Sequence, residues 1–136
     1  MARLIDSSLW VDFMRRKSPP ALKALIHPWI LDPAACLAEP IAFEVLRHAA
    51  PDERPLIQAQ FATLPLLPTP ASLWRDATRL GQTCRDKGYN AGSLDLLIAA
   101  TALHHDAELI TFDAGFTEIG RHTSLNAHHL RRPSPP

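Results

Sequence analysis

The chain has 136 residues, no formal net charge, 46% hydrophobic and 21% charged residues. This length suits one domain with a sizeable core, and the composition excludes a disordered or fibrous protein. With 14 basic and 14 acidic residues there is no global positive field for nucleic acid, so any RNA or DNA contact must come from a local basic patch.

Apolar runs and the Gly and Pro residues between them predict alternating strands and helices. The predicted strands are 3–6, 34–39, 108–112 and a last one near 123–126. The predicted helices are 7–16, 21–30, 41–49, 53–64, 71–88, 94–105 and a short one from 113. Ser7 or Ser8 is expected to cap the first helix. Pro28 is expected to end or bend the second helix. The proline-rich segment 65–70 should be an edge or a connection, since proline interrupts a central strand.

Strands separated by helices predict an α/β fold with a mostly parallel central sheet covered on both faces. We expect residues 1–130 to form a single domain and residues 131–136 to be a disordered tail. In such sheets functional groups gather beyond the carboxyl ends of the strands. Four acids are placed at that edge by the predicted elements: Asp6, Glu44, Asp95 and Asp113.

Each of these acids alone has an ordinary structural explanation. Asp6 or Asp113 could be a helix N-cap. Asp95 could complement a helix dipole with Ser93 as the cap, and Glu44 could be a solvated helix residue. Their joint placement indicates function, because clustered carboxylates repel one another unless they are protonated or bridged by cations.

A carboxylate cluster without His or Cys favours Mg²⁺ or Mn²⁺ over zinc. Such an ion can activate water and stabilise charge on a phosphodiester during in-line attack. The small residues Ala99, Ala100 and Ala102 should let helix 94–105 approach the sheet closely and bring Asp95 toward the other acids.

Four blocks, LIDSSLWVDF, EPIAFEVLRHA, SLDLLIAATAL and LITFDAGFTEI, resemble in order and spacing those of the PIN-domain family, and most closely VapC-type toxins of bacterial toxin–antitoxin pairs. The D-x-L-I-A-A-x-A-L block with the following T-x-D-x-x-F is the most specific part. The resemblance implies a PIN-like three-layer α/β/α ribonuclease that uses Mg²⁺ or Mn²⁺, forms a homodimer and is inhibited by a cognate VapB-type antitoxin.

The same resemblance implies which residues form the catalytic and metal site. By motif position these are Asp6, Glu44, Asp95 and Asp113. Ser8 and Thr111 match polar positions that support such a site. Glu39 is an extra acid near the end of the second predicted strand, and we expect it to support the site indirectly or to be structural.

Basic and aromatic residues leave alternatives open. Three clusters could either serve their helices or contact RNA phosphates: Arg15, Arg16 and Lys17; Arg47; and Arg75 with Arg79. The three tryptophans favour core or interface anchors over base stacking, and their number predicts a homodimer: Trp10, Trp29 and Trp74. The pairs His104–His105 and His128–His129 do not suit a metal site, because adjacent residues point to different faces.

The cysteines and the chain start bear on location. Cys36 and Cys84 are the only cysteines and form no C-x-x-C pattern, so they indicate buried thiols in a reducing compartment. Arg3 and Asp6 interrupt any signal-peptide core. Four prolines break the uncharged run 55–74, which is therefore not a membrane span. We expect a cytoplasmic protein.

Two other functions are consistent with an α/β fold. A non-catalytic RNA- or protein-binding module would not need a carboxylate cluster facing a polyanion. A phosphotransfer receiver or phosphatase would need a D-x-D pair after the first strand and a suitable lysine near the last strands, and the sequence has neither. The sequence therefore favours a metal-dependent endoribonuclease.

Overall fold

Four strands form one sheet in the order β2-β1-β3-β4, and every neighbouring pair is parallel. This computed structural model describes residues 1–134. The strands are β1 (Arg3–Ile5), β2 (Ala35–Cys36), β3 (Glu108–Thr111) and β4 (Ala127–His129). The prediction of an α/β fold with a parallel central sheet is confirmed.

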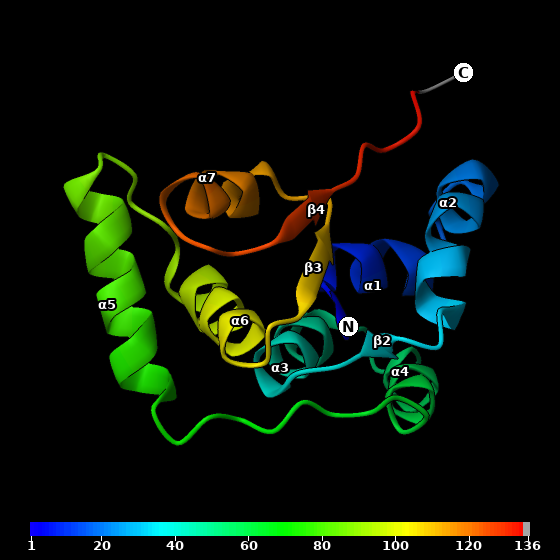
Figure 1. The fold of residues 1–136 in the computed structure, drawn as a ribbon. Helices are drawn as coiled ribbons and strands as arrows, with labels where there is room; N and C mark the ends of the chain where they lie inside the picture. Colours follow the sequence, from blue (N-terminus) through cyan, green and yellow to red (C-terminus); the bar gives the residue numbers. More distant parts are fainter. Residues whose placement is uncertain (135–136) are drawn as a thin grey trace.

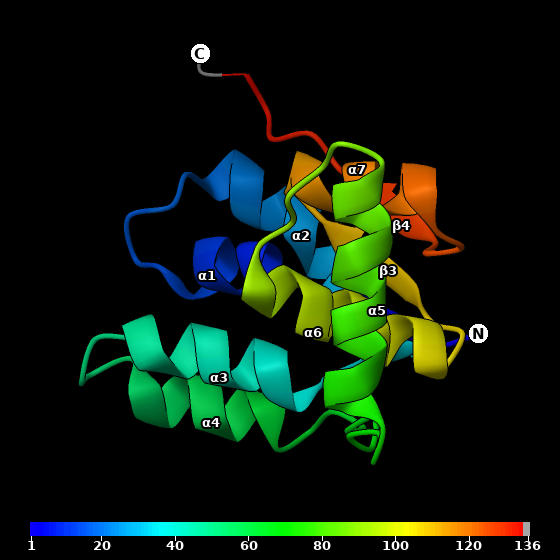
Figure 2. The same cartoon turned by 90° about the vertical axis from the view of Figure 1, so that its left-hand side faces the viewer.

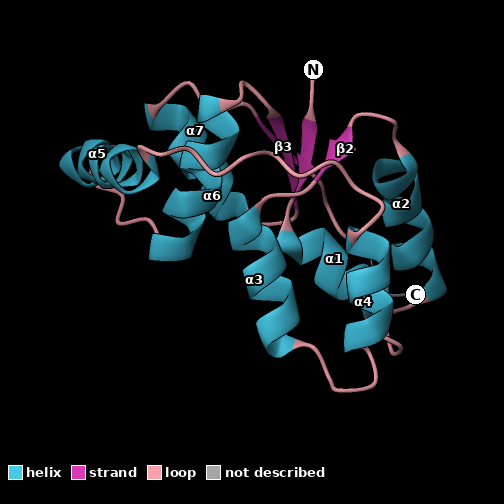
Figure 3. Cartoon of the chain, turned by 90° about the horizontal axis from the view of Figure 1, so that it is seen from below, coloured by secondary structure: helices cyan, strands magenta, loops and turns pink. Residues whose placement is uncertain are grey.

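Residues 1–134 contain seven helices, some packed on the sheet and others on neighbouring helices. They are α1 (Ser7–Met14), α2 (Pro20–Leu31), α3 (Glu39–His48), α4 (Arg54–Phe61), α5 (Leu73–Asp86), α6 (Ser93–His104) and α7 (Ala114–His122). Figure 1 shows α1 and α2 on one side of the sheet and α6 and α7 on the other, with α5 outside α6. Figure 2 shows α3 and α4 side by side, and the view from below in Figure 3 gives the same layers.

The core lies where the two central strands meet the helices. The strands contribute side chains with no exposed surface: Leu4, Ile5, Leu109 and Ile110. Ala99 and Ala102 of α6 belong to the same cluster. Ala100 instead packs with Leu73 and Ala77 of α5 in a second cluster. Helix α6 therefore packs closely, as expected, and its small residues contact the main core on one face and α5 on the other.

The last strand lies four residues later than expected. Helix α7 continues to His122, and the Thr123 hydroxyl then donates to the Ile119 carbonyl oxygen at 2.8 Å and accepts from the Leu125 amide at 3.2 Å. This turn consumes the segment 123–126 that was predicted as a strand. Strand β4 is a short edge with exposed histidines, so it carries no apolar alternation that the sequence could reveal.

The second strand is shorter than predicted. It spans only Ala35–Cys36, and Glu39 begins α3, with Pro40 in the first helical turn. Proline is favoured there because its missing N–H would be unpaired in any case. Glu39 is therefore an exposed residue at a helix start and does not end a strand.

Two helix ends differ from the first expectation: neither Ser7 nor Ser8 caps α1, and Pro28 does not end α2. The N-cap of α1 is Asp6, whose side chain accepts from the Ser8 amide, and is neither Ser7 nor Ser8. Helix α2 runs through Pro28 and ends three residues later. Proline is tolerated there because it lies in the last turn and costs a single helical hydrogen bond.

The segment 65–70 connects α4 to α5 and also extends the sheet edge. Leu67 N donates to Leu37 O at 2.8 Å, and Leu37 N donates to Pro65 O at 2.9 Å.

Cys36 and Cys84 are free and buried. Across residues 1–134, no helix has the length and apolar character needed to cross a membrane.

The predicted disordered tail lies partly outside the described residues, because 135–136 are not described. Residues 131–134 form no helix or strand, yet Arg132 contacts Asp12. The tail and the single-domain boundary at residue 130 stay predictions.

Candidate active site

The sheet order places a switch point between β1 and β3. Strand β1 pairs on one side with β2 and on the other with β3. In open parallel sheets, ligands bind outside the carboxyl ends of the strands at such a point, where successive connections run in opposite directions. Asp6 directly follows β1, and Asp113 follows β3 by two residues.

Asp6 is almost completely buried, with 2% of its surface exposed. Its Oδ2 accepts from the Ser8 hydroxyl at 2.7 Å and from the Thr111 hydroxyl at 2.8 Å. Burial raises the pKa of the Asp6 carboxyl, and these hydrogen bonds counteract part of that effect. The Ser8 and Thr111 hydroxyls therefore fix the orientation of the Asp6 carboxylate.

The same two hydroxyls tie Asp6 to the end of β3. The Ser8 hydroxyl accepts from the Phe112 amide at 3.0 Å, and the Thr111 hydroxyl accepts from the Asp113 amide at 2.9 Å. Each hydroxyl thus accepts from one backbone group and donates to Asp6, which satisfies both of its roles. The ends of β1 and β3 are held in register by this network.

Asp113 is the N-cap of α7, and its Oδ1 accepts from the Gly115 amide at 2.8 Å. A Cβ at Gly115 would lie 2.9 Å from the Tyr89 hydroxyl oxygen and 3.1 Å from Asp113 Oδ1. Glycine therefore permits the close approach of Tyr89 and Asp113, and a side chain here would have to displace them. The cap leaves Oδ2 of Asp113 available to a ligand.

The other two acids stand on helices. Asp95 is in the first turn of α6, and Glu44 is in the middle of α3. The Ser7 hydroxyl can donate its one hydrogen either to Glu44 Oε1 or to Asp6 Oδ1. The sequence suggested Ser7 only as a cap, although its position beside the strand-end Asp6 was a usable signal.

Burial and neighbouring charges raise the pKa of Asp95 to about 6. Desolvation is the largest cause, followed by repulsion from Asp113, Asp6 and Glu44. The charges of Asp113, Asp6 and Glu44 therefore all contribute to the surroundings of Asp95. Perturbed acids in a cleft are a physical mark of functional sites.

All four predicted acids line one open cavity of about 420 Å³. Its walls also include residues that the sequence did not assign to the site: Ser7, Val11, Asp12, His48 and Arg132. Arg15 also lines the cavity, and it is the one member of the predicted cluster of Arg15, Arg16 and Lys17 that does so. Glu39 lies outside this lining and is exposed.

The donor set fits a hard divalent ion. Four carboxylates with no His or Cys ligand favour Mg²⁺ or Mn²⁺. Within residues 1–134, no three His, Cys, Asp or Glu side chains lie close enough to form a ready group of direct ligands. Mg²⁺ often keeps several waters and bonds directly to only one or two carboxylates, so a ready group of three direct ligands is not a requirement for such an ion.

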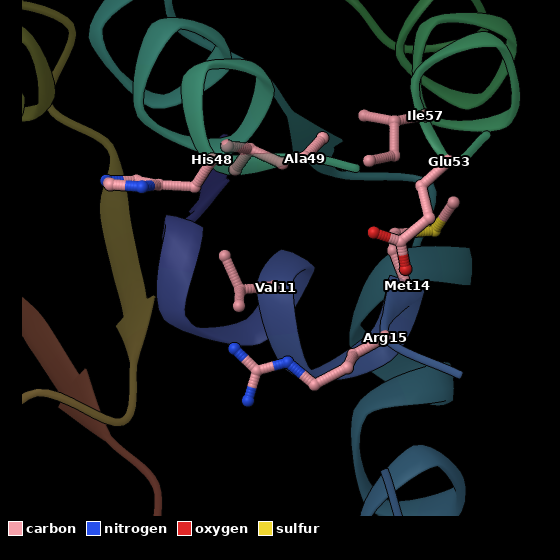
Figure 4. A pocket seen from close by; sticks show the side chains of 8 residues that line it. Val11, Met14, Arg15, His48, Ala49, Glu53 and Ile57 are labelled. Carbon is pink, nitrogen blue, oxygen red and sulfur yellow. The ribbon is translucent and has the colours of Figure 1, made fainter. Parts of the chain in front are cut away.

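A second, narrower pocket of about 70 Å³ adjoins the acidic cavity and shares Val11, Arg15 and His48 with it. Figure 4 shows Arg15 and His48 on either side of Val11, with Ile57 and Glu53 of the opposite wall. The remaining lining is largely apolar. A ligand over the acids could therefore place an apolar group beside them.

The other residues of the predicted basic clusters are not among those that line the acidic cavity. Arg16 pairs with Asp52 at 3.0 Å, and the Arg47 guanidinium lies 5.7 Å from the Phe43 ring centroid. Arg75 lines a separate hollow with Trp74.

The tryptophans divide into three environments. Trp10 is fully buried and packs edge-on against Phe61. Trp29 packs against His128, whereas Trp74 is 73% exposed.

An α/β/α fold with carboxylates at the switch point of its parallel sheet is typical of a class of nuclease domains. The PIN domain family model matches residues 3–122, and the chain therefore belongs to the PIN-domain family.

Among its relatives, the chain is 33% identical to Ribonuclease VapC11 of Mycobacterium tuberculosis, with 94% of this chain and 98% of that protein aligned. A VapC ribonuclease of Mycobacterium bovis gives the same values.

Solved structures share the fold. VapBC2 from Rickettsia felis, bound to a promoter DNA fragment, has a TM-score of 0.71 at 18% identity, covering 96% of this chain and 99% of that one. DNA-bound VapBC from Salmonella typhimurium has a TM-score of 0.74 at 14% identity, covering 95% and 98%.

Proposed function

We propose that this protein is a metal-dependent endoribonuclease and the toxin of a toxin–antitoxin pair. The observation that carries the proposal is the cavity lined by Asp6, Glu44, Asp95 and Asp113, which come from four different elements of a PIN fold. Its 33% identity to VapC ribonucleases over nearly the whole chain supports RNA as the substrate.

The four acids would hold Mg²⁺, with Mn²⁺ as a substitute, partly through retained waters. When bound, the ion supplies charge neutralisation at the phosphodiester and a lowered pKa for attacking water. Asp6 serves as the fixed ligand, because Ser8 and Thr111 orient it. Asp95 and Glu44 close the site from the helices, and Ser7 orients Glu44.

The test is cleavage of single-stranded RNA by the purified protein during titration with Mg²⁺ or Mn²⁺, with EDTA as the metal-free arm. We expect cleavage only with a divalent ion and none by Asp95→Asn. Metal-independent cleavage would refute the metal role. RNA binding without cleavage under any ion would favour the non-catalytic binding module.

The proposed protein partner is a VapB-type antitoxin that covers the acidic cavity. Clustered carboxylates attract an Arg or Lys side chain, which can replace the charge of the metal. The apolar pocket next to the acids offers a second contact for the same partner (Figure 4). Inhibition that survives removal of every antitoxin residue near the acids would contradict this mechanism.

We also propose a homodimer in the cytoplasm, where RNA is available. Trp10 is buried and Trp29 is half-buried, whereas Trp74 is 73% exposed and is the tryptophan available to a second copy of the chain. A large exposed aromatic is typical of an interface core. Light scattering at micromolar concentration should give twice the mass of one chain, and a monomer mass would contradict the proposal.

A further inference from the structure

Arg132 forms one wall of the acidic cavity although it lies beyond the last strand. Its Nε donates to Asp12 Oδ2 at 2.8 Å. Its guanidinium carbon lies 4.6 Å from the centroid of the Phe112 ring. The Asp12 side chain is only 13% exposed, so Arg132 compensates a largely buried charge.

The backbone before Arg132 is fixed against the end of β3. Leu130 N donates to Thr111 O at 2.7 Å, and His129 Nε2 lies 3.0 Å from the Phe112 carbonyl oxygen. These contacts hold the segment beside the hydroxyl network that orients Asp6. Figure 1 shows this segment leaving β4 toward the C-terminus. The position of Arg132 is therefore set by the fold.

The contacts of Arg132 leave its terminal nitrogens available. A guanidinium has five N–H donors, and only Nε is directed at Asp12. The side chain is 52% exposed and also lines a neighbouring hollow with Ser8 and Asp113. Its ion pair is with Asp12, which is not one of the four site acids, so the cation is held beside the metal-binding position and not in it.

A cavity of this charge needs cations to receive a polyanion. Five carboxylates and two arginines line it. We infer that Arg132 binds the phosphate of single-stranded RNA next to the one that is cleaved, and that Asp12 and Phe112 are positioning residues for its guanidinium. This inference rests on the proposed ribonuclease function. Arginine suits the role because its planar fork binds phosphate oxygens while one face stacks on an aromatic ring.

The test measures binding of a fluorescein-labelled, mixed-sequence single-stranded RNA octamer in the Asp95→Asn background, at increasing salt. Arg132→Ala should weaken binding about tenfold. It should also reduce the slope of log affinity against log salt by about 0.7, the value for one phosphate contact on a single strand. Arg131→Ala removes the same charge from an exposed neighbour outside the cavity lining and should leave affinity nearly unchanged.

Because Arg132→Ala leaves Asp12 without its partner, a double variant guards against misfolding. Asp12→Asn with Arg132→Ala removes both charges and keeps the net charge of the wild type. It should fold, with a melting temperature near that of the parent, and still bind the octamer weakly. Arg132→Lys should restore part of the affinity, since lysine binds phosphate as a point charge.

Cleavage kinetics with the native Asp95 separate this inference from the proposed function. Arg132→Ala should raise KM about tenfold and leave kcat within about threefold, because the contact is made to substrate away from the reacting phosphate. If the wild type cleaves RNA and the Arg132→Ala and Arg131→Ala variants have equal KM values, the inference about Arg132 is wrong and the proposed ribonuclease function still stands. Tighter RNA binding or faster cleavage by Arg132→Ala would also overturn it, by making Arg132 an internal blocking cation. A wild type that neither binds nor cleaves RNA would overturn both.

Discussion

The strand half of the acidic site, Asp6 and Asp113, differs from its helix half, Glu44 and Asp95, in how the carboxylates are held. Asp6 accepts two side-chain hydroxyl hydrogen bonds to one oxygen, and Asp113 is locked as a helix cap. Glu44 is oriented through the Ser7 hydroxyl. Asp95 has a pKa of about 6, raised by burial and by the other three acids.

The two halves therefore differ in whether the orientation of the carboxylates or their charge is the main feature. The strand half is pre-organised, because hydroxyls from two chain segments fix it before any ligand arrives. In the helix half, Asp95 is disfavoured as a carboxylate by burial and by the neighbouring acids, and protonation or a cation relieves this. Substitutions in the strand half should therefore disturb geometry, and substitutions in the helix half should mainly change charge.

The largest expected effect is from Asp95→Asn, which should lower RNA cleavage on the order of a hundredfold or more, since a metal ligand supplies several kcal/mol of transition-state stabilisation. The apo protein should be as stable or more stable, because repulsion is relieved while a helix-dipole contact of about 0.3–1 kcal/mol is lost. Stabilisation by Mg²⁺ should shrink. Cleavage rates and melting temperatures with and without Mg²⁺ are the measurements. Full activity would remove Asp95 from the site.

Thr111→Val should come next, with a loss of about 10–100-fold in activity or metal affinity, as for other residues that orient a metal ligand. It removes a donor to Asp6 and the acceptor for the Asp113 amide. Thr101→Val is the matched control, since Thr101 is also buried but its hydroxyl bonds only within α6, to Leu97 O. Equal activity of the two variants would show that the hydroxyl network does not pre-organise the site.

Gly115→Ala should destabilise the protein by about 1–3 kcal/mol, the usual cost of overpacking. The new methyl group would clash with the Tyr89 hydroxyl and press on Asp113. Adding Tyr89→Phe removes the clashing oxygen and should recover most of the lost stability. Urea unfolding of the single and double variants measures this. No recovery would mean that the strain falls on the Asp113 cap instead.

The smallest effect is the pH dependence of the metal-free protein. Folding raises the pKa of Asp95 to about 6, above the ordinary value of an aspartate carboxyl, so the unfolded chain releases its proton first as pH rises. The contribution of Asp95 to the free energy of unfolding is therefore most favourable below about pH 4. It falls between about pH 4 and 6 and stays reduced at higher pH. After discounting for partial exposure the loss is about 1 kcal/mol. Asp95→Asn should flatten this part of the curve, and an unchanged curve would contradict the assigned shift.

Much of the site was predictable because its acids occupy special places in the pattern. Asp6 and Asp113 each follow an apolar run that ends a strand, and Asp95 interrupts an apolar helix at its start. Arg132 and Asp12 were not predictable. A single arginine after the last strand and an aspartate inside a helix have no local signal, and their pairing spans 120 residues.

The sequence by itself determined the α/β class, the alternation of strands and helices, and the four acids, because hydrophobic periodicity and strand-end polarity are local properties. Only the tertiary structure decided that Asp6, and neither Ser7 nor Ser8, caps α1, that Ser7 lies between two acids, that Ala100 faces α5, and that Arg132 borders the cavity. These facts depend on which segments distant in the chain come together. That is set by the strand order β2-β1-β3-β4 and the packing of helices on it, and no local pattern encodes either one.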